Sequence, residues 1–187
     1  MKIVIVGAGA MGRFLGGMLG RSGNEVIFVE KDPGIVDAIN HKGIQFIELG
    51  ASGTAPYLTV KAWAIQDGKS IEACDLTILA VKSYVTASAA RGIRHLVTES
   101  SPILTLQTGL GNVETLCEIL DPENILGGVT YHGSTSLRDS MVRHAGTGRT
   151  IIGEIDGEIG ERVERVQALL NASDIHTRIT DNVMGHI

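Results

Sequence analysis

The chain has 187 residues, of which 43% are hydrophobic and 20% charged, a composition that excludes general disorder. Sixteen Lys and Arg against 21 Asp and Glu give a net charge of −5, and aromatic residues make up only 4%. Nucleic-acid and anionic-membrane partners are therefore not expected, because both favour a basic surface, and single strands favour aromatic ones.

Few features point to a metal, a disulfide or a membrane. Cys74 and Cys117 are too few for a disulfide framework or a zinc site, so we expect two reduced thiols and no metal. The apolar run at 3–6 is broken by glycines, and no stretch of about 20 apolar residues occurs, so neither a signal peptide nor a membrane span is predicted. These features indicate a cytoplasmic protein.

The first 42 residues predict strands alternating with helices. The first strand is a β-branched run typical of a buried parallel strand, and the first helix carries apolar residues at helical spacing. The Asp32-Pro33 pair is typical of a helix start. The expected elements are strand 2–6, helix 10–22, strand 25–30 and helix 32–41.

Alternation continues through the rest of the chain. Further strands are predicted at 44–48, 57–60, 75–81, 102–106, 125–130 and 174–179, the first two being separated by a Gly/Ser/Ala turn region. Helices are predicted at 84–97, 112–120 and 157–171, and the stretch 131–152 is turn-rich and β-like. This order predicts an α/β protein with a Rossmann-like, doubly wound, mostly parallel sheet.

The last residues resemble the start of another element. Thr180-Asp181 is typical of a helix cap, and the sequence stops about two turns later, at Ile187. We therefore expect a dinucleotide-binding domain at 1–179 and, at 180–187, the start of a truncated helical second domain that is otherwise missing. The apolar surface that such a domain would cover predicts a homodimer or a disordered tail.

The strongest local motif is the GxGxxG sequence at residues 7–12, which lies between a predicted strand and a predicted helix. In this motif Gly7 permits a tight turn, Gly9 lets a pyrophosphate approach the backbone, and Gly12 lets the helix pack on the sheet. Ala10 and Met11 begin the helix whose free N–H groups would face the phosphates. The motif predicts a dinucleotide site rather than a glycine turn used only for packing.

Two charged residues at the end of the second strand bear on the choice of coenzyme. An acid at this place favours the ribose diol of NAD, and a cation favours the 2′-phosphate of NADP. The sequence offers both, as Glu30 and Lys31, and one of them can be a solvated surface charge. The residues alone leave the choice open.

Three further segments carry a resemblance to a known family. They are 79–84 (LAVKSY), 107–112 (QTGLGN), and 128–133 (GVTYHG) with 144–148 (HAGTG) and 152–153 (IG). In order and spacing, the chain is similar over essentially its whole length to the dinucleotide-binding part of the ketopantoate reductase (2-dehydropantoate 2-reductase) family. The opening MKIVIVGAGAMG is shared with many dehydrogenases and adds little specificity.

The resemblance implies a reaction and several site residues. The family reduces 2-dehydropantoate, a 2-keto acid, to pantoate with NADPH, in pantothenate and coenzyme A synthesis. By resemblance the phosphate loop is Gly7, Gly9, Ala10, Met11 and Gly12, Lys31 replaces the arginine that binds the 2′-phosphate, and Lys82 lies on the nicotinamide-ribose side of the cleft. Lys31 favours NADP, while Glu30 keeps NAD open.

The chain departs from the family pattern at two places. Thr108 stands where the family has an asparagine that contacts cofactor and substrate, and threonine lacks the paired amide donor and acceptor. The family's catalytic lysine would fall just beyond Ile187, so the catalytic residue is unknown and the chain alone is expected to be inactive. His132 and His144 could replace the missing acid, but bonds from each to local backbone are the more ordinary expectation.

Three hypotheses therefore stand. The first is an NADPH-dependent 2-dehydropantoate reductase represented by its cofactor domain. The second is a non-catalytic NAD(P)-binding module, favoured by Thr108 and the missing lysine. The third is an NAD-dependent 2-hydroxy-acid dehydrogenase of the same superfamily, favoured by Glu30.

Overall fold

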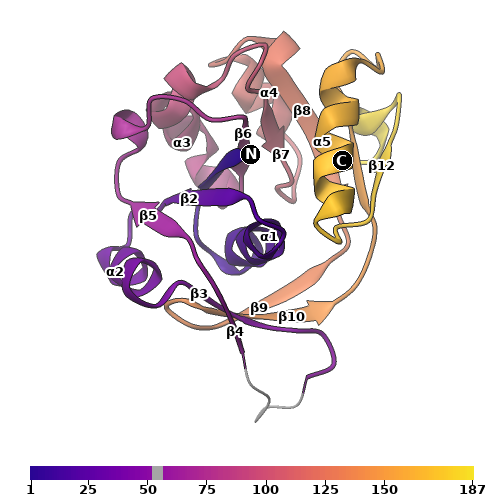
Figure 1. The fold of residues 1–187 in the computed structure, drawn as a ribbon. Coiled ribbons are helices and arrows are strands. Elements are labelled where there is room, and N and C mark those ends of the chain that lie inside the picture. The colour runs from indigo at the N-terminus through magenta and orange to yellow at the C-terminus, as the bar shows by residue number, and fades with distance from the viewer. Residues whose placement is uncertain (52–56) are drawn as a thin grey trace.

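The chain folds around two β-sheets that share one helix between them (Figure 1). A computed structural model describes residues 1–51 and 57–187. The turn region predicted between the strands at 44–48 and 57–60 lies mostly at 52–56, outside the described residues.

The larger sheet has eight strands in the order β12-β11-β8-β7-β6-β1-β2-β5. The strands are β1 (Lys2–Val6), β2 (Glu25–Val29), β5 (Trp63–Ile65), β6 (Leu76–Leu79), β7 (Ile103–Thr105), β8 (Ile125–Thr130), β11 (Thr150–Glu154) and β12 (Thr177–Ile179). The six strands from β5 to β8 run parallel, and β11 lies antiparallel to β8. The predicted fold class, a Rossmann-like and mostly parallel sheet, is confirmed.

The strand order reverses at β1, and this places the site. From β1 the chain passes to β2 on one side and later returns to β6 on the other side. In open α/β sheets, ligands bind beyond the carboxyl ends of the strands at such a reversal. The glycine motif lies at this point, directly after β1.

The smaller sheet has four strands in the order β4-β3-β10-β9, and the sequence did not predict it. They are β3 (Ile44–Ile47), β4 (Leu58–Val60), β9 (Gly133–Arg138) and β10 (Met141–Gly146). The strands of 44–60 were expected, and 131–152 was expected to be β-like, but their pairing was not. β10 joins β3 in parallel, with Val142 opposite Phe46.

Helices cover both faces of the larger sheet. They are α1 (Ala10–Arg21), α2 (Pro33–Lys42), α3 (Thr86–Ile93), α4 (Asn112–Cys117) and α5 (Glu161–Ala172), with short 3₁₀ turns η1 (Gly68–Ser70), η2 (Ser83–Val85), η3 (Arg94–Leu96), η4 (Pro122–Asn124) and η5 (Val183–Gly185). Successive residues of β1 point to opposite faces: Ile3 and Ile5 share a buried cluster with α1 and α5, whereas Val4 and Val6 share one with α3 and α4.

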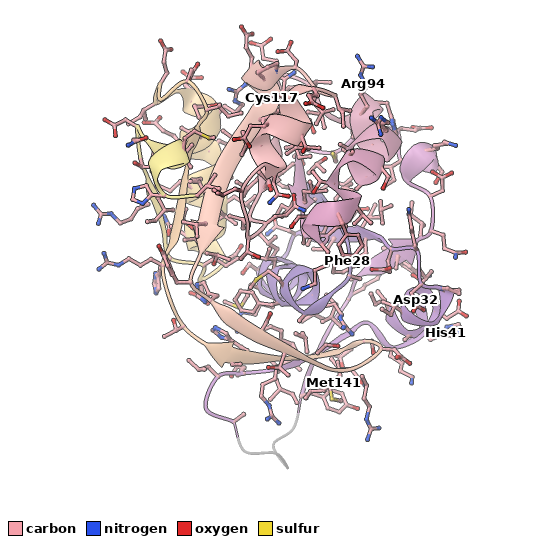
Figure 2. All side chains as sticks on the ribbon, turned by 180° about the vertical axis from the view of Figure 1, so that it is seen from behind. Phe28, Asp32, His41, Arg94, Cys117 and Met141 are labelled. Carbon is pink, nitrogen blue, oxygen red and sulfur yellow. The ribbon has the colours of Figure 1, made fainter. Side chains whose placement is uncertain are left out.

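Helix α1 lies between the two sheets, and its glycines permit this close packing (Figure 1). A Cβ atom added at Gly16 would lie 2.4 Å from Phe28 Cζ, and one at Gly17 would lie 2.4 Å from Phe46 Cδ2. Figure 2 shows Phe28 inside the molecule, whereas Asp32 and His41 point outward from the edge. The helix that follows the glycine motif is therefore fixed on both sides.

Several predicted elements differ in extent from the observed ones. The helix expected at 84–97 is divided into η2, α3 and η3, and α5 begins four residues later than expected, at Glu161. β5 was not predicted at all. The helix expected from Thr180-Asp181 is a 3₁₀ turn, η5, whose cap is Asn182, and the buried Val183 packs it against β8 and β11.

Candidate cofactor site

The three glycines of the motif have different surroundings. Gly7 has φ +98°, and a Cβ there would lie 2.8 Å from Val81 Cγ1. A Cβ on Gly12 would lie 2.0 Å from the Gly7 carbonyl oxygen, which is impossible without a shift of the backbone. A Cβ on Gly9 would have no neighbour within 4 Å. Gly7 and Gly12 are therefore required by the fold, whereas the bare backbone of Gly9 leaves room for a ligand.

A buried arginine, which the sequence did not single out, holds the glycine loop against the smaller sheet. Arg13 is 2% exposed, and its guanidinium donates to the carbonyl oxygens of Arg138 and Asp139, the Ser136 hydroxyl and the Gly9 carbonyl. Burial lowers the pKa of Arg13, while the charges of Glu30 and Asp139 oppose this shift. A charged side chain directly after a glycine motif was the only available signal.

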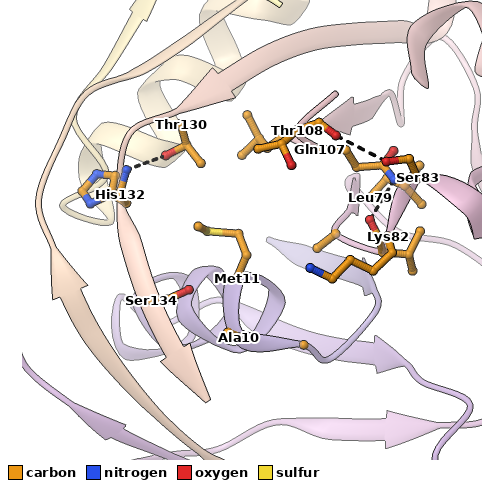
Figure 3. Close-up of a pocket in the computed structure, with 14 residues that line it drawn as sticks. Ala10, Met11, Leu79, Lys82, Ser83, Gln107, Thr108, Thr130, His132 and Ser134 are labelled. Atoms are coloured by element: carbon orange, nitrogen blue, oxygen red, sulfur yellow. Dashed lines mark hydrogen bonds between the residues drawn. The ribbon is translucent and has the colours of Figure 1, made fainter. Parts of the chain in front are cut away.

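On one side of the glycine loop lies a cavity of about 420 Å³, named here the Lys82 cavity (Figure 3). It lies between the start of α1, the ends of β6 and β7, and the segment that connects β8 to β9. Its lining includes Gly9, Ala10, Met11, Lys82, Ser83, Gln107, Thr108, Thr130, His132 and Ser134. Figure 3 shows the ammonium end of Lys82 pointing into this space. Five of the eight predicted cofactor-binding residues meet here: Gly9, Ala10, Met11, Lys82 and Thr108.

On the other side, beyond the end of β2, lies a second cavity of about 440 Å³, named here the Glu30 cavity. It is lined by the predicted residues Gly7 and Lys31 and also by Glu30, Asp67 and Lys69. Gly12, the remaining predicted residue, is buried and lines neither cavity. The two cavities extend to either side of the same loop, as the two halves of a dinucleotide require.

The Glu30 carboxylate is held in place by backbone groups. It accepts hydrogen bonds from the Ala8 N–H at 2.8 Å and the Asp32 N–H at 3.0 Å. It therefore bridges the glycine loop and the start of α2. Lys31 is exposed, and its carbonyl oxygen accepts a bond from Gln66 Nε2 at 3.2 Å. The acid is fixed in the cavity wall, and the lysine lies at the solvent side.

The expected bond to local backbone is present at His144, whose ring bonds the backbone at Gly146, whereas the His132 ring has no such bond among the described residues. The two rings contact each other, with 3.2 Å between His132 Nδ1 and His144 Nε2, and both rings pack against Phe14 with centroid distances of 5.1 and 4.6 Å. The expectation was wrong for His132 because its partner, His144, lies on β10, and spacing along the chain does not reveal this contact. The imidazole pair ties one wall of the Lys82 cavity to α1.

Burial is the main influence on both imidazoles. It lowers the pKa of His132, with smaller contributions from His144 and His176, and it lowers the pKa of His144, where Arg21 adds to the shift and a backbone bond at Gly146 opposes it. Neutral rings suit a pair in which one nitrogen donates and the other accepts. His132 Nε2 has no hydrogen-bond partner among the described residues.

Neither a metal-binding cluster nor a membrane-spanning helix occurs in the part of the chain that the structure describes. No group of three His, Cys, Asp or Glu side chains there is arranged to hold a metal ion. None of the described helices is both long and apolar enough to cross a membrane.

The reversal of strand order, with a glycine loop at that point and cavities on both sides of it, defines a Rossmann-type domain of the class that oxidoreductases use for nicotinamide dinucleotides. The model of the family described as "Ketopantoate reductase PanE/ApbA" matches residues 3–157. The chain belongs to this family, which confirms the resemblance found in the sequence.

Individual relatives agree with this assignment. A 2-dehydropantoate 2-reductase of Pyrococcus abyssi is 34% identical over 187 residues, which are 100% of this chain and 59% of the relative. The solved 2-dehydropantoate 2-reductase of Geobacter metallireducens GS-15 is 32% identical with a TM-score of 0.85, over 97% of this chain and 58% of that one. A D-mandelate dehydrogenase solved with NADH and anilino(oxo)acetate is 26% identical with a TM-score of 0.87, over 98% and 58%. The chain therefore spans less than two thirds of the length of these proteins.

Proposed function

We propose that this chain is the cofactor-binding part of an NADPH-dependent 2-dehydropantoate 2-reductase, which reduces a 2-keto acid to a 2-hydroxy acid. The observation that carries the proposal is the open backbone at Gly9, where a Cβ would meet nothing within 4 Å, between two cavities of about 420 and 440 Å³. The family to which the chain belongs and the names of its relatives supply the reaction. The chain spans 59% of the Pyrococcus abyssi relative, so the activity of a whole protein remains a proposal.

The residues present fit a dinucleotide. The Gly9 backbone and the first turn of α1 offer N–H groups to a pyrophosphate, and no side chain fills the space above Gly9. When bound, the reduced coenzyme supplies a hydride to the substrate carbonyl. Lys82 places a positive charge in the cavity next to the loop, where it suits a substrate carboxylate or a ribose hydroxyl. No residue of the chain is assigned as proton donor.

The choice of coenzyme depends on the Glu30 cavity. Lys31 supports NADPH, because a cation at the end of β2 attracts the 2′-phosphate. One observation favours NADH as the alternative: Glu30 is held on the Ala8 N–H at 2.8 Å, so its charge stays next to the loop, where a ribose diol can donate to it. The D-mandelate dehydrogenase with bound NADH is a structural neighbour that supports this second candidate, an NAD-dependent 2-hydroxy-acid dehydrogenase.

The first experiment is a fluorescence titration of the 187-residue chain with NADPH and with NADH. Under the proposal, at least one coenzyme binds and the tighter one identifies the class. If neither binds, the proposed function is wrong. In a turnover assay with 2-dehydropantoate, appreciable activity of the chain would exclude a non-catalytic binding module. We expect little turnover from the chain alone, because water reaches this end of the site: Tyr84, next to Ser83, and Leu110, two residues after Thr108, are 88% and 85% exposed.

A further inference from the structure

A continuous chain of hydrogen bonds runs behind the Lys82 cavity, between the segment after β6 and the loop after β7. Gln107 Nε2 donates to the Thr86 hydroxyl at 2.9 Å and to the Val81 carbonyl at 2.8 Å. The Thr86 hydroxyl donates to Asn112 Oδ1 at 3.1 Å. Asn112 Nδ2 then donates to the Gly109 carbonyl at 2.8 Å. Each bond in this chain joins groups at the rear of the cavity.

The direction of these bonds is fixed at every step. Asn112 uses its amide nitrogen on loop carbonyls, so its oxygen must accept, and Thr86 must therefore donate to it. The remaining lone pairs of the Thr86 oxygen accept from Gln107. The oxygen of the Gln107 amide accepts from the Thr105 hydroxyl at 3.1 Å. Only one arrangement of donors and acceptors satisfies all of these groups.

Thr86 is the buried link between the two segments, which are also joined by Gln107 Nε2 to the Val81 carbonyl at 2.8 Å and by the Ser83 hydroxyl to the Thr108 carbonyl at 3.4 Å. Thr86 is 1% exposed and Asn112 is 3% exposed, so water does not replace a bond that either one loses. Thr86 lies at the start of α3, directly after η2 and four residues beyond Lys82, whereas Gln107 and Asn112 bracket the loop that carries Thr108. Gly109 and Gly111 in this loop have φ +100° and +86°, so the loop is held by its bonds and not by regular structure.

We propose that the Thr86 hydroxyl is a positioning group for the nicotinamide end of the site, because it fixes the spacing between Lys82 and Thr108 across the cavity. This inference rests on the proposed function. Thr86 does not line either cavity and acts through its neighbours. It is therefore expected to change how the nicotinamide half binds, and to leave the adenosine half in the Glu30 cavity unchanged.

The test compares two ligands on the same 187-residue chain. One is the reduced coenzyme that binds the wild type more tightly, and the other is its adenosine half, 5′-AMP or adenosine 2′,5′-bisphosphate. Thr86→Val keeps the shape and removes the hydroxyl, which leaves Gln107 and Asn112 unsatisfied. We expect about tenfold weaker binding of the whole coenzyme and unchanged binding of the adenosine half. Thr86→Ser, which keeps the hydroxyl, should restore the wild-type ratio.

Two further variants keep the test decisive. Thr115→Val removes a threonine hydroxyl that bonds the carbonyl of Gly111, the cap of α4, at 2.7 Å without joining the two segments, and should leave both affinities unchanged. Thr86→Ala removes the same hydroxyl with a smaller side chain and should reproduce the selective loss if Thr86→Val does not fold. Equal loss of both ligands in a folded variant, or no loss of either, would overturn the inference. Failure of the wild type to bind either ligand would instead refute the proposed function.

Discussion

The two cavities beside the glycine loop are built in different ways. The Glu30 cavity carries charged side chains near solvent, and its Lys69 and Asp67 side chains are 80% and 62% exposed. The Lys82 cavity is backed by buried hydrogen bonds through Thr86 and by a buried imidazole pair. Exposed charges are easily exchanged, whereas buried bonds hold a geometry. We infer that the first cavity selects the coenzyme and the second aligns it.

The largest expected effect concerns the loop that the two cavities share. Gly9→Val places a side chain in open space, so the fold should persist while coenzyme binding weakens by about 100-fold or more, because the pyrophosphate can no longer approach the backbone. Fluorescence titration and thermal unfolding measure the two quantities. Gly12→Val is the contrasting variant, since its Cβ would lie 2.0 Å from the Gly7 oxygen, and it should destabilise the fold. Unchanged affinity in Gly9→Val would remove the site assignment.

The next largest effect is expected on stability, at Arg13, which holds the glycine loop against the smaller sheet. Arg13→Met leaves the carbonyls of Arg138 and Asp139 without their buried donor, and we expect a loss of about 3 kcal/mol in the free energy of unfolding. Urea denaturation measures this loss. Arg94→Met is a control, because Arg94 is exposed at the surface (Figure 2) and should change stability by less than about 0.5 kcal/mol. Equal stabilities of the two variants would contradict the role given to Arg13.

A smaller effect is expected from substitutions in the Glu30 cavity, which test the selectivity between NADPH and NADH directly. Glu30→Gln removes the negative charge beside the ribose position, and the ratio of NADPH to NADH affinity should rise about tenfold. Lys31→Gln should move the same ratio in the opposite direction. Titration with both coenzymes gives the ratio for each variant. If neither substitution moves it, the selectivity lies outside this cavity.

The smallest effect is a pH dependence of stability. Because burial lowers the pKa values of His132 and His144 in the folded chain, the unfolded chain binds protons first. The contribution of the two neutral imidazoles to the free energy of unfolding is complete above the unfolded pKa of about 6.5. It is lost as the pH falls through that value towards the folded pKa values. The charges of two neighbours act in the same direction: His176 lowers the pKa of His132, and Arg21 lowers the pKa of His144.

Urea denaturation between pH 5 and pH 8 checks this dependence, with pH as the only variable. His144→Gln keeps a hydrogen-bonding side chain that does not titrate, so the stability should fall less steeply with acid than in the wild type. If the stability of His144→Gln depended on pH as steeply as that of the wild type, the His132–His144 pair would not be the cause of the pH dependence.

The part of the fold that could be predicted from the sequence is the part built from local signals. The strands β1, β2, β6, β7 and β8 are short apolar runs, and the glycine motif follows the first of them, so the parallel sheet and its ligand edge could be derived. β5 was missed because Trp63–Ile65 is only three residues long and lies at the edge of the sheet.

The second sheet could not be predicted, because its pairing joins β3 to β10 across almost 100 residues. The same reason applies to the site. Gly9, Lys82 and Thr108 stand in motifs at strand ends, whereas Arg13, Thr86 and the His132–His144 contact depend on which segments the fold brings together. Single residues were visible in the sequence, but their partners were not.

Helix α1 has one consequence for protein engineering. Replacing a helical glycine by alanine is a standard way to stabilise a protein, usually by about 1 kcal/mol, because it removes backbone freedom from the unfolded chain. Gly16, Gly17 and Gly20 are candidates on paper, yet an added methyl group at each would collide with Phe28, Phe46 or Val60 at 2.4 to 2.6 Å. Thermostabilisation schemes that rank positions by helix propensity would therefore choose α1 first and damage the very element on which both sheets rest.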